Sequence, residues 1–101
     1  MFFIPRVNVI ESDTGFSVEV LGRTGLRYAE GGRAVTAEAE LLSGPHGLSL
    51  HANTIACWDP PFNTEVIDDA ERARIVDNIR AAFRFRGIEI EVSMGMGVFP
   101  P

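Results

Sequence analysis

The stretch that decides the fold of this chain is IDDAERARIVDNIRAAFRFRG, residues 67–87. Its apolar residues recur at the spacing of one helix face, which indicates an amphipathic helix packed on a core: Ile75, Val76, Ile79, Ala82 and Phe83. Asp68 followed by Glu71 is typical of a capping box at a helix start, and Gly87 suits the left-handed residue that ends a helix. The stretch therefore predicts the one long helix of the chain, and Ile79→Asp is expected to unfold the protein.

Segments with strand-like alternation surround this helix. Five precede it and one follows: 6–12, 16–20, 26–30, 33–42, 48–58 and 88–92. Val7 and Val9 are expected to share one face of the first strand. Residues 2–4 either extend that strand or fold separately, because Pro5 interrupts the pattern. A change of phase near Asn53 indicates a bulge or a break in the fifth strand.

The longest predicted strand, 33–42, places small residues on its inner face, including Ala37 and Ala39. Small side chains allow a close approach, and we expect the helix to pack there. Short connections favour antiparallel neighbours. The fold class is therefore α+β, with an antiparallel sheet of about five to six strands against one C-terminal helix, followed by a final strand. We expect a single domain over residues 1–101, with an N-terminal extension at 1–5 and a loosely held tail at 94–101.

Composition restricts the partners. The chain of 101 residues carries a formal charge of −5, which argues against nucleic acid or an anionic membrane as the main partner and favours a basic one. The single cysteine, Cys57, permits no internal disulfide and fits a reducing compartment. With no signal-peptide pattern and no long apolar run, a cytoplasmic protein is expected.

One triplet, Asp13-Thr14-Gly15, matches the catalytic motif of aspartic proteases. A dimer of this chain would bring two carboxylates together, and a small dimeric hydrolase using Asp13 is the resulting alternative. However, a strand resumes directly at Phe16, and a hairpin turn explains both the Asp and the Gly. The turn is the favoured interpretation.

Other polar residues also have ordinary explanations. His46, His51 and Cys57 match no zinc spacing, so we expect no metal and no cofactor, and Cys57 is expected to be a small buried residue. Two pairs of carboxylates, Glu38 with Glu40 and Glu89 with Glu91, are expected on solvated outer strand faces.

Trp58 begins a proline-stiffened segment, WDPPF, residues 58–62. Trp is a favoured anchor of protein interfaces, so this segment is a candidate contact surface. Capping of the core where the helix begins is the favoured interpretation of Trp58, and the two interpretations are not exclusive.

Three strings together resemble a known family: LRYAEGGR at 26–33, Trp58-x-Pro60, and RI-x-x-NI-x-x-A-x-x-F-x-G at 74–87 followed by IEI. They resemble the immunity protein 74 family of bacterial polymorphic toxin systems, over residues 22–92. The resemblance implies a small non-catalytic protein that binds and neutralises a cognate toxin. If the two proteins have complementary charges, the toxin is basic. Within the shared strings, Glu30, Arg33 and Trp58 are the candidate partner-binding residues. A self-associating module, or a homodimer, is a further alternative.

Overall fold

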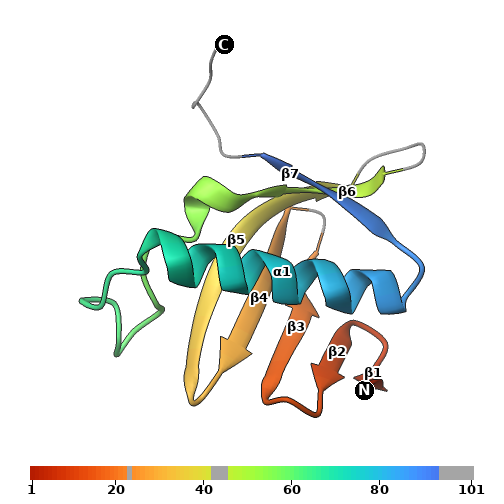
Figure 1. The fold of residues 1–101 in the computed structure, drawn as a ribbon, viewed down its shortest axis with the longest axis horizontal. Helices are drawn as coiled ribbons and strands as arrows, with labels where there is room; N and C mark the ends of the chain where they lie inside the picture. Colours follow the sequence, from red (N-terminus) through yellow and green to blue (C-terminus); the bar gives the residue numbers. More distant parts are fainter. Residues whose placement is uncertain (23, 42–45, 94–101) are drawn as a thin grey trace.

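The computed structural model describes residues 1–22, 24–41 and 46–93. A curled sheet of seven strands follows the chain order, and one helix crosses its inner face (Figure 1). The elements are β1 (Phe2–Arg6), β2 (Val9–Ser12), β3 (Phe16–Val20), β4 (Gly25–Glu30), β5 (Arg33–Leu41), β6 (His46–His51), η1 (Ala52–Thr54), α1 (Asp69–Phe85) and β7 (Glu89–Ser93). The α+β class is as predicted, with one or two more strands than expected.

The sheet is mixed, which corrects the expectation of a wholly antiparallel one. Strands β1 to β6 pair antiparallel with their neighbours, but β7 lies parallel to β6. A parallel pair needs a long crossover, and the loop and α1 that separate these two strands in the chain provide it.

The first predicted strand, 6–12, is also wrong in part, because the chain reverses at Val7 and Asn8. Val7 is 84% exposed, whereas Val9 is 3% exposed. The reversal is held by Arg86, whose guanidinium Nη1 donates to the Val7 carbonyl at 3.0 Å. Residues 2–4, left open by the sequence, belong to the separate edge strand β1, where Pro5 is tolerated.

The predicted break near Asn53 is confirmed, because β6 ends in the short helix η1. Beyond it, Ile55 is fully buried, but Cys57 is exposed and forms an isolated bridge with Val66. The expectation of a buried Cys57 was wrong, because this bridge turns the chain into a surface loop instead of continuing the strand.

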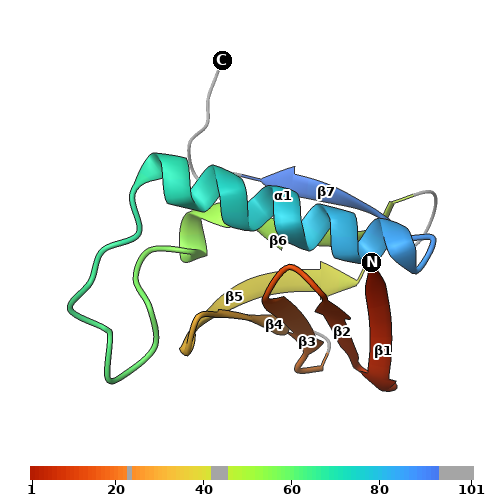
Figure 2. The same ribbon diagram turned by 60° about the horizontal axis from the view of Figure 1, so that its bottom comes forward.

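The helix matches its prediction closely. Asp68 accepts from the Glu71 backbone N–H at 2.8 Å and completes the capping box, and Gly87 follows the helix with a φ of 79°. All five residues of the predicted apolar face are buried. Ala37 and Ala39 of β5 are buried in the same core, but α1 approaches β7, β2 and β3 most closely, and η1 is the element that lies close to β5. Figure 2 shows this helix lying over one side of the sheet.

One expectation, the loosely held tail at 94–101, lies outside the described residues. Within the described ranges, no helix has the length and apolarity required to cross a membrane.

Candidate functional site

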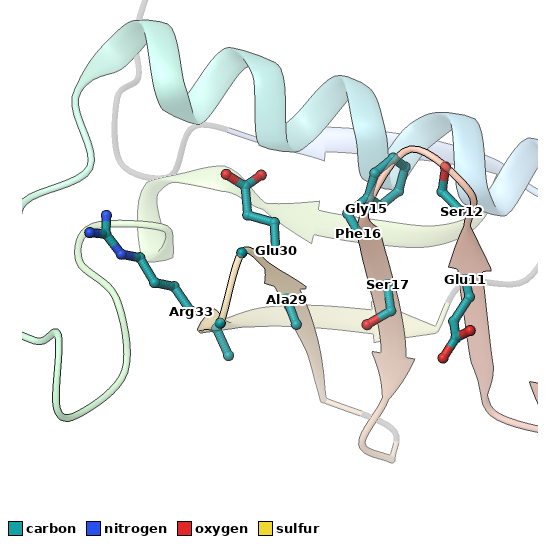
Figure 3. A pocket seen from close by; sticks show the side chains of 11 residues that line it. Glu11, Ser12, Gly15, Phe16, Ser17, Ala29, Glu30 and Arg33 are labelled. Atoms are coloured by element: carbon teal, nitrogen blue, oxygen red, sulfur yellow. The ribbon is translucent and has the colours of Figure 1, made fainter.

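A shallow groove of about 420 Å³ lies at the ends of two hairpins, between the β2–β3 turn and the β4–β5 turn (Figure 3). The β4–β5 turn is Gly31-Gly32, whose φ angles of 56° and 81° are tolerated by glycine. The turn places Glu30 and Arg33, two of the three predicted partner-binding residues, beside each other at this groove.

Glu30 points from the end of β4 toward α1 (Figure 3). Its Oε1 accepts from the Arg74 guanidinium at 2.5 Å and from the Tyr28 hydroxyl at 2.5 Å. Asn78 donates in turn to the Tyr28 oxygen at 2.8 Å. This network joins β4 to the middle of the helix and holds the carboxylate in one position.

The network also fixes charge states. The hydrogen bond from Arg74 holds the pKa of Glu30 below its usual range, with further help from the Tyr28 hydroxyl. Burial, followed by the bond to Glu30, raises the pKa of Tyr28 above its usual value. At neutral pH the site therefore holds a carboxylate anion fastened by a neutral phenol and a guanidinium.

Arg33 points away from Glu30, toward the loop that precedes the helix (Figure 3). Its Nη1 lies 2.7 Å from Glu65, and its guanidinium carbon lies 5.0 Å from the centre of the Phe62 ring. The side chains of Arg33 and Glu65 are 40% and 43% exposed, so this pair lies at the surface. Arg33 thus links the β4–β5 turn to the loop.

The loop is attached to the sheet by further bonds around Asp59. The Asp59 backbone N–H donates to the Ala34 carbonyl at 2.7 Å, and its carboxylate accepts from the Thr36 hydroxyl at 2.9 Å. These bonds fix the loop against β5 and leave Phe62 partly exposed beside Arg33.

Trp58 does not share this surface. Its side chain is 2% exposed and belongs to the main core, so of the two interpretations that the sequence left open the structure supports the core-capping one. Trp58 anchors the base of the loop from within the core.

Sequence reasoning missed Arg74 and Glu65, whereas Phe62 belongs to the 58–62 segment that the sequence offered as a candidate contact surface. The helical period places Arg74 opposite the apolar face of the helix, but its side chain reaches Glu30, which lies 44 positions away in the sequence. The only available signal was its place in the third resemblance string.

The Asp13 triplet forms the β2–β3 turn, as the favoured interpretation held. The Asp13 carboxylate accepts from the Met1 ammonium at 2.9 Å, and Gly15 has a φ of 106°. In the described part of the chain, no group of three or more His, Cys, Asp or Glu side chains is arranged to hold a metal ion.

Fixed charges, a partly exposed aromatic ring and a shallow groove thus lie together on one surface of a small α+β protein. The family described as Immunity protein 74 matches residues 17–93, which confirms the resemblance seen in the sequence. The chain therefore belongs to the immunity protein 74 family. Searches of curated proteins and of solved structures found no match.

Proposed function

We propose that this protein is a non-catalytic immunity protein that binds a cognate bacterial toxin in the cytoplasm and blocks it. The observation that carries the proposal is family membership over residues 17–93, which covers the strands and helices from β3 to β7 apart from the first residue of β3. The name of the family gives the class of partner, and the net charge of −5 favours a basic toxin.

We further propose that Glu30 and Arg33 contact the toxin. Both side chains are held by partners within the chain before any toxin arrives, Glu30 by Arg74 and Arg33 by Glu65. Binding then orders few side chains, and a preorganised surface loses less entropy than a mobile one. Arg33 and Phe62 together supply the kinds of side chain that often dominate binding energy at interfaces.

The test uses the toxin encoded in the adjacent reading frame, expressed in a host with and without this chain. Protection by the wild type and a purified complex of the two proteins are expected. A double variant, Glu30→Gln with Arg33→Gln, is expected to lose protection, with binding weakened about tenfold or more.

The matched control is the double variant Arg84→Gln with Glu89→Gln, which removes an exposed ion pair of 2.9 Å at the other end of the helix. It makes the same pair of charge changes and should protect like the wild type. Absence of both complex and protection for the wild type would refute the toxin-binding proposal. Equal protection by both double variants would refute only the assigned contact residues.

A further inference from the structure

A second groove, of about 360 Å³, lies between the first half of α1 and strand β7, which run side by side in both ribbon views (Figures 1 and 2). Its lining residues are Asp69, Arg72, Ala73, Val76 and Asp77 of α1 and Val92 of β7. None of them lines the groove beside Glu30 and Arg33. The two grooves are therefore separate features of the surface.

The floor of this α1–β7 groove is apolar. Val76 is 8% exposed, and the partly buried Val92 packs against the main core. Ala73, one turn before Asp77, carries only a methyl group, so the helix leaves the groove open at this position. Covering an apolar floor of this kind removes it from water and favours binding of an apolar group.

The cation in the lining, Arg72, is already engaged inside the protein. Its Nε donates to the Ile55 carbonyl at 2.9 Å, and its Nη2 donates to the Ile67 carbonyl at 3.2 Å. Its Nη1 lies 2.6 Å from the Asp69 carboxylate, so these two charges compensate each other. Arg72 is therefore poorly placed to attract an acidic ligand to the groove.

Asp77 supplies the free charge of the lining. Its side chain is exposed, and it forms no hydrogen bond or ion pair in the described part of the chain. Arg74, three positions before it, is bound to Glu30, and Arg80, three positions after it, does not line the groove. The groove therefore combines an apolar floor with one uncompensated carboxylate at its rim, which favours a cationic ligand.

An apolar floor beside a carboxylate matches a side chain with an apolar stem and a charged end. Lysine buries its four-carbon stem along apolar surface and keeps its ammonium at the rim. The ammonium is a compact charge with three donors, so a single carboxylate is a sufficient partner, whereas the planar guanidinium of arginine is best matched by bidentate contacts.

We propose that the α1–β7 groove binds one lysine side chain of the cognate toxin, with the stem against Val76 and Val92 and the ammonium donating to the Asp77 carboxylate. The proposal rests on the proposed function, because it assigns the lysine to the toxin. It adds a second contact region, separate from Glu30 and Arg33, and specifies the chemistry that this region recognises.

The first experiment needs no toxin. n-Pentylammonium, which has the stem and head of lysine, is titrated into the full chain with labelled methyl groups, and NMR follows Ala73, Val76 and Val92. 1-Pentanol and pentanoate are the neutral and anionic controls. We expect saturable shifts at all three residues, with n-pentylammonium bound about three- to fivefold more tightly than 1-pentanol, and pentanoate weakest. No saturable shifts, or equal binding of the three compounds, would overturn the proposal.

Two variants at exposed helix positions separate the stem from the charge. Asp77→Asn should remove the preference for n-pentylammonium and leave 1-pentanol binding unchanged. Ala73→Leu fills the groove and should weaken both compounds. The matched control, Glu38→Gln, removes one carboxylate charge from β5 and should keep the preference. Equal loss of the preference in Glu38→Gln and Asp77→Asn would show an effect of net charge and would contradict the site.

The same methyl signals test two other occupants. Shifts that follow protein concentration without any probe would assign the groove to a second copy of the chain. A variant of the full chain in the segment 94–101, Val98→Ser with Phe99→Ser, should bind n-pentylammonium like the wild type. Tighter binding by this variant would show that the chain's own end competes for the groove. Either result would overturn the assignment to the toxin.

A second experiment separates this inference from the proposed function. With the toxin of the adjacent reading frame, Asp77→Lys should weaken binding about tenfold, because it places like charges together. If the toxin binds the wild type and Asp77→Lys equally well, the lysine contact is wrong and the immunity role stands. If the toxin does not bind at all, the immunity role and the toxin assignment both fail, and the amine titration still decides what the groove recognises.

Discussion

The protonation state of Glu30 should affect the free energy of unfolding of the protein. The Arg74 hydrogen bond lowers its pKa from the ordinary value of 4.5, so folding favours the ionised form. Because the folded-state pKa is depressed, this contribution is fully present above about pH 4.5 and is lost as pH falls through the folded-state pKa. The destabilisation caused by Glu30→Gln should therefore be larger at neutral pH than in acid.

Urea unfolding of the wild type and Glu30→Gln across this range gives the measurement. In an Arg74→Gln background the pH dependence of the difference should be smaller, since the main cause of the shift is gone. An identical pH dependence in both backgrounds would contradict the assigned cause.

Ile79 tests the core at a single position. Its side chain is fully buried on the face of α1 that packs on the sheet, so Ile79→Ala should cost about 2–5 kcal/mol through lost transfer free energy and the cavity left behind. Ile79→Asp should unfold the chain, because it adds a buried carboxylate without a partner. Ala81→Asp, on the exposed side of the same helix, is the control. Circular dichroism melting curves measure all three, and an unchanged curve for Ile79→Asp would refute the packing.

The burial of a helix residue such as Ile79 could be predicted from the sequence, whereas the exposure of Cys57 could not. The helical spacing of apolar residues around Ile79 is set by neighbours in the sequence, so it can be recognised without knowing the contacts between distant segments. The exposure of Cys57 depends on its bridge with Val66, and a nearby bond joins the Ile67 backbone N–H to the Ala56 carbonyl at 2.9 Å. Pairing of this kind between two segments of a loop produces no periodic pattern of apolar residues in the sequence.

At the scale of the element, the start of α1 offers a direct test. The Asp68 carboxylate accepts from the Glu71 N–H, so Asp68→Ala should destabilise the protein by about 0.5–2 kcal/mol. Asp68→Ser keeps an acceptor at the cap and should recover most of that loss. Urea unfolding measures both variants, and equal loss for Ala and Ser would show that the cap bond does not stabilise the helix.

Element order was more predictable than element pairing. Turn residues and alternation locate strands such as β3 and β5 to within a residue or two, because both signals are local. The parallel pairing of β7 with β6 follows from the path of the chain between them, including where the 57–66 loop attaches to β5. The candidate site shows the same contrast between local signals and contacts from distant segments. Glu30 and Arg33 flank a recognisable glycine turn, whereas the contacts that hold them come from α1 and from the loop.

For the whole molecule, the question is whether the two open sheet edges pair with another copy. Phe3, Ile4 and Val7 expose apolar surface near the β1 edge, at 46%, 44% and 84%. Against pairing, Pro5 lacks an N–H within β1, and the register between β1 and β2 shifts between Phe3 and Arg6. The other edge strand, β7, carries exposed glutamates. Prolines, irregular pairing and charges of this kind protect edges from association.

We therefore expect a monomer, not the self-associating module or the homodimer. Light scattering coupled to size exclusion, at tens to hundreds of micromolar protein, should give the mass of one chain. Pro5→Val restores a backbone donor to the β1 edge and should raise the average mass as concentration increases. Pro60→Val, outside the sheet, is the matched control for loss of a proline and should stay monomeric. A wild-type mass of two chains would show that the apolar surface of β1 outweighs the protection that Pro5 provides.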